Sequence, residues 1–251
     1  MTERRAWQIV LERVESDLLS GDLGPGDHLP PERLLAAELG VGRSSVREAL
    51  RVLEVLGLIR TNAGSGPSSG AIIVALPGGG MSTLMRLQVA AQGFPVADVV
   101  KTRLVLEGSV VAELAELAST NEGPDLAHAT RLLDAMDRSA LSEAEFLALD
   151  AQFHLCLAEA GGNQVVTATM AGLRSAIEGY ALAGVAKIVS WPATSARLRR
   201  EHRDILAAIS HGDAPAARLA VHGHISGYYA ETHLTSAEHI LPHENRTPRH
   251  G

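Results

Sequence analysis

Three histidines and one aspartate in the second half of the sequence have the spacing of a metal site. Asp150 and His154 are four residues apart, so a helix would project both from one face. His202 lies ten residues before the turn at 212–213 and His224 lies eleven after it, so two antiparallel helices would bring them to a similar height. One carboxylate and three imidazoles suit a transition metal such as Zn²⁺.

The other histidines show no such convergence in the sequence. His222 is two residues from His224, which turns its side chain about 200° away around a helix. His128, His211 and the histidines of the C-terminal tail have no convergent partners. Because a single histidine is more often structural than a ligand, the metal hypothesis depends on the four residues together.

Positioning these four residues requires a helical bundle, and the sequence after residue 80 favours one. Ala, Leu, Glu and Arg recur there at helical period, and no segment indicates a strand. The expected helices are 82–92, 95–119, 123–139, 142–160, 163–185, 193–211 and 213–235. The expected fold class is therefore mainly α, with an all-α antiparallel bundle in the C-terminal part.

The stretch 29–74 is typical of a helix-turn-helix followed by a small hairpin. Its first helix begins after two prolines and ends at the 40–42 turn, with Leu34, Leu35 and Leu39 on its apolar side. A second helix is expected over 43–56, with an inward side made of Val46, Leu50, Leu53 and Val55. Ser45 and Glu48 fit a capping box near its start. Before this pair, an amphipathic helix is expected over 4–20.

Three arginines follow the second of these helices at four-residue spacing. Arg43, Arg47 and Arg51 therefore stack on its solvent-facing side, where a helix-turn-helix contacts DNA. Strands expected over 58–61 and 71–74, joined by a glycine-rich loop, form a β-wing that can approach a phosphate backbone. The alternative is a solvated helix face, in which Arg51 pairs only with a neighbouring glutamate.

Composition narrows the class of protein. The chain has 251 residues, 46% hydrophobic and 3% aromatic, which favours helices with cores of Ala, Leu and Val. The single cysteine, Cys156, excludes an intrachain disulfide and is typical of the reducing cytoplasm. No apolar run reaches the length of a membrane span, so we expect a cytoplasmic protein without a membrane partner. The net charge of −7 does not exclude DNA, because binding needs a basic patch and not a basic chain.

The stretch 29–74 resembles the DNA-binding domain of the GntR family of bacterial transcription regulators, through PERLLAAELGVGRSSVREALRVLEVLGLI and the glycine-rich wing after it. The resemblance implies a winged helix whose DNA-binding residues are Arg33, Arg43, Ser44, Ser45, Arg47 and Gly66. Arginines contact the operator, and the serines and the wing glycine lie near phosphates. Gly42 departs from the family, which usually has serine there, so one hydroxyl contact to phosphate is missing.

Residues 95–235 resemble the FCD domain, the all-helical effector domain of one GntR branch. The characteristic residues of that domain match Arg103 and Glu107, Asp150 and His154, Glu201 and His202, and His224 near the end of the domain. In metal-containing members the Asp and His positions bind one divalent metal, which holds a small carboxylate effector. The resemblance thus implies metal ligands Asp150, His154, His202 and His224. Arg103 either clamps the effector carboxylate or forms a salt bridge with Glu107.

The two resemblances imply four segments. These are a winged helix-turn-helix domain over 1–76, a linker over 77–81, an effector-binding and dimerisation domain over 82–236 and a disordered tail over 237–251. The implied function is a ligand-responsive, sequence-specific DNA-binding transcription regulator, expected to be a repressor and not an enzyme. Two chains would pair as a homodimer and read a palindromic operator in successive major grooves.

The expected switch is allosteric. A small carboxylate would complete the coordination of the metal and shift DNA affinity by about 1–3 kcal/mol. Zn²⁺ is the first expectation for the metal, with Ni²⁺, Mn²⁺ and Fe²⁺ as alternatives.

Two other functions stay open. The first is a metal-independent regulator that binds an acyl-CoA-like or other effector, in which the histidines are incidental. The second is a metal-dependent hydrolase fused to a DNA-binding domain. A hydrolase would need a general base, and Glu201, although next to a ligand, is expected to point elsewhere.

Overall fold

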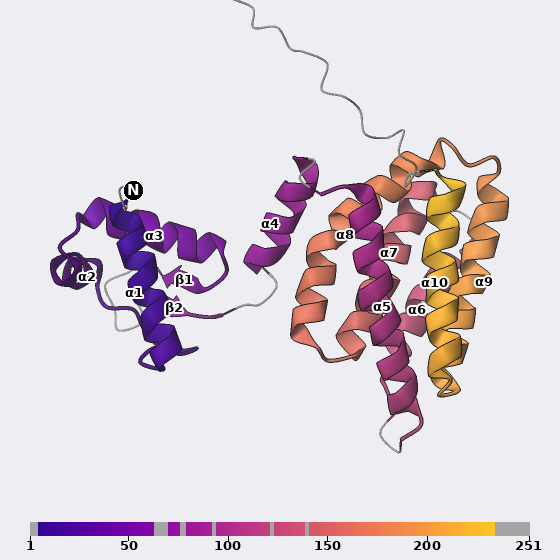
Figure 1. Ribbon diagram of the computed structural model, residues 1–251, viewed down its shortest axis with the longest axis horizontal. Coiled ribbons are helices and arrows are strands. Elements are labelled where there is room, and N and C mark those ends of the chain that lie inside the picture. Colours follow the sequence, from indigo (N-terminus) through magenta and orange to yellow (C-terminus); the bar gives the residue numbers. More distant parts are fainter. Residues whose placement is uncertain are drawn as a thin grey trace, which may run out of the picture. The chain divides into compact units, whose positions relative to one another are not determined.

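The chain divides into two compact units. The computed structural model describes residues 5–62, 70–75, 79–91, 94–120, 123–138 and 141–233. The first unit is Met1–Met85 and the second is Arg86–Gly251. The second is all helical in its described residues, whereas the first adds a two-stranded sheet to its helices (Figure 1). The expected fold class, mainly α with a small β-wing and a helical C-terminal part, is confirmed.

The first unit contains three helices followed by a hairpin. Its elements are α1 (Ala6–Ser20), α2 (Glu32–Leu39), α3 (Arg43–Val55), β1 (Ile59–Asn62) and β2 (Gly70–Ile73). The strands are antiparallel, with Ile59 opposite Ile73 and Asn62 opposite Gly70. The 40–42 turn joins α2 to α3, and Gly40 takes the left-handed conformation that glycine adopts without a steric penalty.

Apolar residues from every element close the core of this unit. Val14, Leu35, Val46 and Leu53 are buried in it, together with Ile73 of the wing. These positions hold α3 against α1 and α2, which leaves the opposite side of α3 in solvent.

Three local predictions in this unit are wrong. Leu34 is 45% exposed and Val55 is 67% exposed, because each lies just beyond the apolar side of its helix. The capping box at Ser45 is also absent. Helix α3 begins three residues earlier than such a box requires, with Gly42 at the N-cap and no side-chain cap.

The second unit is a helical bundle. Its elements are α5 (Val96–Ala118), α6 (Ala127–Met136), α7 (Glu143–Ala160), α8 (Gln164–Val185), α9 (Trp191–Ser210) and α10 (Ala214–Glu231), while α4 (Gly79–Ala90) crosses the division between the units. All seven helices expected after residue 80 are present. Helix α6 is the one most shortened, since Leu126 caps it and residues 123–126 are not helical.

The predicted linker differs from the structure. Gly79, Gly80 and Met81 form the first turn of α4, and residues 76–78 lie outside the described ranges. A Cβ atom on Gly80 would lie 2.3 Å from the backbone oxygen of Leu56. This glycine therefore allows a close backbone approach and not a flexible link. The tail over 237–251 also lies outside the described residues.

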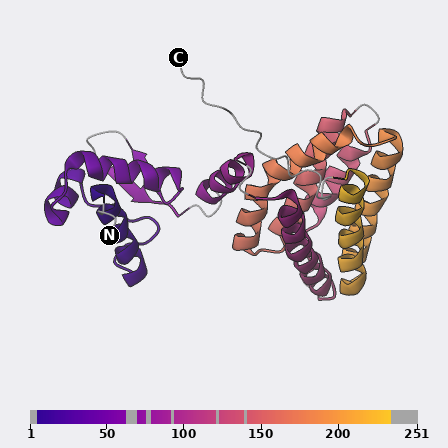
Figure 2. The same ribbon diagram turned by 45° about the horizontal axis from the view of Figure 1, so that its top comes forward.

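The helices of the bundle pack against one another around a common interior. Helix α10 packs against α5 and α9, and α7 packs against α8, α6 and α5. Figures 1 and 2 both show α5 and α10 side by side. Apolar side chains such as Leu114, Phe153, Leu198 and Ile205 fill the interior. Within the described ranges, no helix is both long enough and apolar enough to cross a bilayer.

Candidate metal centre and DNA-reading helix

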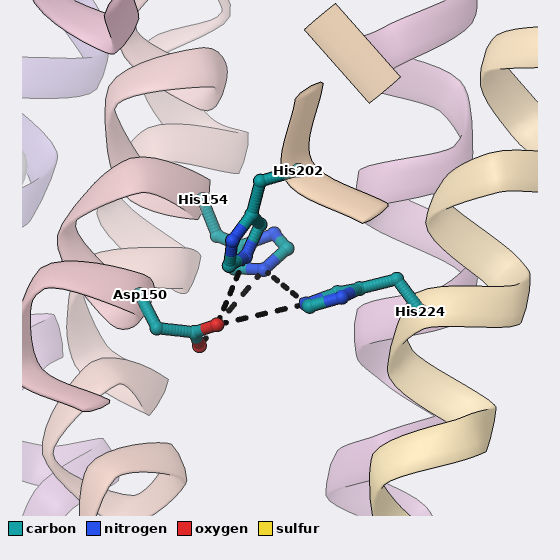
Figure 3. A group of neighbouring side chains, drawn as sticks. All are labelled: Asp150, His154, His202 and His224. Atoms are coloured by element: carbon teal, nitrogen blue, oxygen red, sulfur yellow. Dashed lines mark hydrogen bonds and ion pairs between the residues drawn. The ribbon is translucent and has the colours of Figure 1, made fainter. Parts of the chain in front are cut away.

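The four predicted metal residues meet inside the helical unit (Figure 3). Asp150 and His154 come from α7, His202 from α9 and His224 from α10. Each is at most 8% exposed, and His202 is fully buried. One ligand atom of each residue lies within 4.8 Å of those of the other three. Three helices therefore converge on one small polar volume in the interior of the bundle.

The distances in this cluster are short. His154 Nε2 lies 3.1 Å from His224 Nε2, and Asp150 Oδ1 lies 2.9 Å from His202 Nε2 and 3.6 Å from His224 Nε2. Atoms that share one zinc ion at about 2.0–2.1 Å lie about 2.9–3.4 Å apart at octahedral or tetrahedral angles. The observed spacings are close to this range. His202 Nδ1 is buried without a hydrogen-bond partner in the protein, and the contact of His202 Nε2 is the one with Asp150 Oδ1.

Two glutamates support the histidines from outside the cluster. Glu107 Oε2 lies 2.5 Å from His154 Nδ1, and Glu201 Oε2 lies 3.0 Å from His224 Nδ1. An imidazole that donates its Nδ1–H to a carboxylate keeps its Nε2 lone pair for the centre of the cluster. The expectation that Glu201 points elsewhere is wrong, because α9 turns this side chain toward α10.

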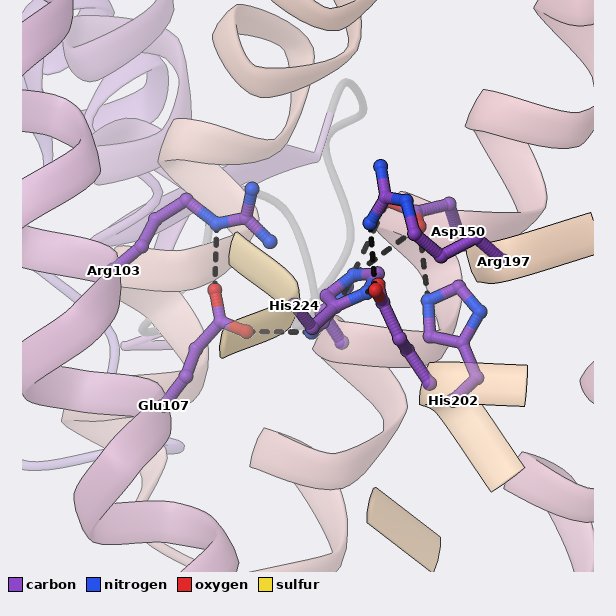
Figure 4. A network of polar contacts seen from close by, with 8 residues as sticks. Arg103, Glu107, Asp150, Arg197, His202 and His224 are labelled. Carbon is purple, nitrogen blue, oxygen red and sulfur yellow. Dashed lines mark hydrogen bonds and ion pairs between the residues drawn. The ribbon is translucent and has the colours of Figure 1, made fainter. Parts of the chain in front are cut away.

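Arg103 takes part in the same network on α5 (Figure 4). Its Nε donates to Glu107 Oε1 at 2.6 Å, so the expected salt bridge is present. A second guanidinium nitrogen, Nη2, is buried without a partner, as is the hydroxyl of Tyr229. Burial would raise the pKa of Glu107, but Arg103 and His154 outweigh it and lower this pKa to about 2. The carboxylate is therefore ionised and holds both of its neighbours.

Sequence reasoning missed Arg197. This side chain donates to Glu201 Oε1 at 2.6 Å and to Glu231 Oε2 at 2.5 Å, so it joins α9 to the end of α10. The i, i+4 spacing of Arg197 and Glu201 was visible in the sequence and could have suggested the first contact. The second contact depends on the packing of α10 against α9.

The cluster keeps its carboxylate ionised. Burial would raise the pKa of Asp150, but contacts with His202 and His224 hold it well below its usual value. Burial and the nearby His224 lower the pKa of His202 to about 4, so this imidazole is neutral at pH 7. Burial would also lower the pKa of His224, but Asp150 and Glu201 outweigh it and raise this pKa. An ionised carboxylate beside neutral imidazole is the donor set that a divalent cation requires.

A small cavity adjoins the cluster. Asp150, His224, Arg103 and Tyr229 form its polar side, and apolar residues such as Leu198 form the rest. A molecule in this cavity would lie beside Arg103, Asp150 and His224. The wall of this cavity therefore carries one guanidinium, that of Arg103, and one carboxylate, that of Asp150.

The residues expected to bind DNA lie on the solvent side of the first unit. Arg33, Arg43, Ser44 and Arg47 are exposed, and Ser45 is half-buried. Arg47 Nε is 3.4 Å from Glu32 Oε2, an exposed pair that is easily exchanged for another anion. Gly66 lies outside the described residues.

Arg51 lacks the partners that the sequence offered. The carboxylate of Glu54 accepts hydrogen bonds from the backbone and the hydroxyl of Thr61, which fixes α3 to the wing strand. Among the described residues, Arg51 forms no ion pair with Glu48 or Glu54. It is therefore exposed beside Arg47 on the same side of α3.

Comparisons with known proteins agree with this architecture. The family model described as bacterial regulatory proteins of the gntR family matches residues 8–67, and the FCD domain model matches residues 98–227. The repressor NanR of Klebsiella aerogenes is 34% identical over 178 residues, which are 69% of this chain and 65% of that protein. NanR of Salmonella arizonae is 29% identical over 246 residues, or 93% of this chain and 86% of that one.

A solved structure shows the same fold. Streptococcus agalactiae GntR has a TM-score of 0.59 and 25% identity, with 90% of this chain and all of that chain covered. A winged helix followed by a helical effector domain defines a DNA-binding transcription regulator. The chain belongs to the GntR family, in the branch that carries an FCD domain. Its relatives are transcriptional repressors and not enzymes.

Proposed function

We propose that this protein is a repressor whose helical unit senses a small carboxylate metabolite through a bound divalent metal. The observation that carries the proposal is the buried convergence of Asp150, His154, His202 and His224. Apolar replacements of similar volume would stabilise such a position better than four buried polar groups, one of which, His202, has a ring nitrogen without a partner. A ligand that uses these atoms explains why polar side chains stand at this place in the core.

The donor set fits a divalent transition metal. Three imidazoles and one carboxylate suit Zn²⁺ first, and also Ni²⁺, Mn²⁺ or Fe²⁺. Glu107 and Glu201 fix the orientation of His154 and His224, as outer partners do around metal-binding histidines. A divalent ion held there would supply positive charge and coordination positions that a carboxylate can fill.

Arg103 is the residue that we propose to bind the effector carboxylate from the protein side. Its Nη2 is buried and unpartnered, and Arg103 lines the cavity beside Asp150 and His224. Because Glu107 already holds Nε, the guanidinium is fixed in place before the effector arrives. The salt bridge and the effector contact, offered by the sequence as alternatives, are therefore compatible.

The first unit would bind the operator DNA. We propose that Arg33, Arg43 and Arg47 contact operator DNA, with Ser44, Ser45 and Gly66 near phosphates. Two copies would pair in the cytoplasm so that two α3 helices enter successive major grooves of a palindromic operator. An effector that favours one arrangement of the helical units would then change DNA affinity by about 1–3 kcal/mol.

Metal content of the untagged protein tests the sensor directly. The comparison is between the parent and a variant with His202→Ala and His224→Ala. We expect about one metal per chain at the internal cluster, absent from the variant, since one site needs all its ligands. If the parent holds no metal at this cluster even after reconstitution, the sensor proposal fails. The effector would then have to be sought among ligands that need no metal, such as an acyl-CoA.

A further inference from the structure

A second group of metal-ligating side chains lies at the edge of the helical unit. His128 is in the first turn of α6, and Cys156 and Glu159 are near the end of α7. One ligand atom of each lies within 4.8 Å of those of the other two. The prediction that His128 has no convergent partner is therefore wrong. Its partners are 28 and 31 residues away in the sequence and meet it only because α6 packs against α7.

This outer cluster is separate from the internal one. Cys156 follows His154 by two residues, which places its side chain about 200° away around α7. His154 points to the centre of the bundle, while Cys156 points toward α6 with its side chain buried. His128 and Glu159 are exposed, so the thiol lies at the base of a pair of solvent-facing ligands.

The side chains of this outer cluster are available to bind a ligand. Within the described ranges, the side chains of His128, Cys156 and Glu159 form no hydrogen bond or ion pair with the protein. A sulfur, a nitrogen and a carboxylate that converge without bonding one another are available for a common ligand.

The surroundings favour a cation. The charged groups that act on the thiol are the carboxylates of Glu159 and Asp125 and the guanidinium of Arg131, which gives a negative balance. Cys156 and Glu159 also lie near the carbonyl end of α7, where the helix dipole attracts positive charge. Thiolate, imidazole and carboxylate are together the three ligand types of protein-bound Zn²⁺.

We propose that His128, Cys156 and Glu159 bind a Zn²⁺ ion that ties the start of α6 to the end of α7. On binding, the thiol releases its proton to solvent and the sulfur coordinates as thiolate. Three protein ligands leave one position for water. Because α7 also carries Asp150 and His154, the ion would stiffen the helix that holds half of the internal cluster.

The single cysteine makes the experiment specific. The untagged full-length protein is stripped of metal and titrated with Co²⁺, and the near-ultraviolet thiolate-to-cobalt charge-transfer band is recorded. Cys156 is the only sulfur of this kind in the chain, and the internal cluster has none. We expect a saturable band in the parent that Zn²⁺ then removes. We expect the same band in a variant with Asp150→Ala and His202→Ala, so the outer site is tested independently of the proposed sensor.

Matched variants identify the ligands. Cys156→Ser should abolish the band. His128→Ala and Glu159→Gln change exposed side chains, so they keep the fold and should weaken Co²⁺ binding by about tenfold or more, the loss that even outer partners of a metal can cause. His222→Ala, an exposed histidine on α10, is the control and should leave the band unchanged. The absence of a band in the parent at saturating Co²⁺ would overturn the proposal. A band that persists undiminished in both exposed variants would overturn it as well.

Discussion

The two units of this protein hold their functional side chains in opposite environments. In the first unit, Arg43 and Arg47 are exposed on α3, and the ion pair of Arg47 with Glu32 is at the surface. In the second, Arg103 and Glu107 are each 3% exposed and bonded to each other in the centre of a bundle. The Arg47–Glu32 ion pair is therefore solvated, whereas the Arg103–Glu107 ion pair is buried.

The difference follows from what each unit is proposed to bind. A surface arginine remains solvated until DNA replaces its water and counterions, so the unbound protein needs no partner for it. A buried charge must be compensated within the protein, because burial without a partner costs several kcal/mol. Substitutions in the first unit should therefore change binding with little effect on stability. In the second unit they should change both.

The largest expected effect is at Glu107. Glu107→Ala leaves the guanidinium of Arg103 buried without its partner, so we expect the free energy of unfolding to fall by about 3–5 kcal/mol. Chemical denaturation followed by tryptophan fluorescence measures this. In a Trp7→Phe background, Trp191 on α9 reports the helical unit alone.

The matched surface pair is Arg47 with Glu32. Glu32→Ala should change the free energy of unfolding by no more than about 1 kcal/mol, because the pair is solvated. Trp7 fluorescence in a Trp191→Phe background reports this unit. Equal losses for Glu32→Ala and Glu107→Ala would contradict the contrast between the two units.

The next effect concerns DNA affinity. Arg43→Ala and Arg47→Ala should each weaken operator binding by about 1–3 kcal/mol if they contact base edges, and by less if they contact phosphates. Fluorescence anisotropy with a palindromic duplex, selected by the parent protein from a random library, measures the change. Arg131→Ala on α6 removes the same charge far from α3 in the sequence and serves as the control. If it weakens binding as much as the α3 variants, the assignment of α3 as the reading helix is wrong.

A smaller effect is expected at Glu201. Glu201→Gln keeps the size of the side chain but weakens its hold on His224 Nδ1, so metal affinity should fall about tenfold with stoichiometry unchanged. Competition with a chromophoric chelator gives the affinity. Glu231→Gln changes the neighbouring partner of Arg197 without touching a histidine, and it should have a weaker effect. An unchanged affinity in Glu201→Gln would show that the outer carboxylate does not position the ligand.

The smallest effect is at the N-cap of α3. Gly42 has extended backbone angles that a side chain can adopt, and an added Cβ would meet the Ser44 hydroxyl oxygen only at 3.5 Å. Gly42→Ser should therefore stabilise the first unit by a few tenths of a kcal/mol, since serine caps helices slightly better than glycine. Gly42→Ala adds the carbon without the hydroxyl. If both variants gain equally in Trp7-detected unfolding, the gain does not come from capping.

The sequence by itself determined the class of fold and the identity of the internal cluster. Apolar periodicity located every helix of the second unit, because each helix buries one side against the same core. The i, i+4 spacing of Asp150 and His154, and the similar distances of His202 and His224 from one turn, are properties of helix geometry. These geometric relations hold for any α-helix with this spacing, whichever residues pack around it.

Only the tertiary structure decided which side chains bond to the histidines of the internal cluster. It also decided which other side chains from different helices come into contact. Glu107 and Glu201 reach histidines on other helices, and Arg197 reaches Glu231 across α9 and α10. His128 finds Cys156 for the same reason. Such contacts depend on the rotation and translation of one packed helix against another. Side-chain packing over the whole interface sets these quantities, and no local pattern along the chain encodes them.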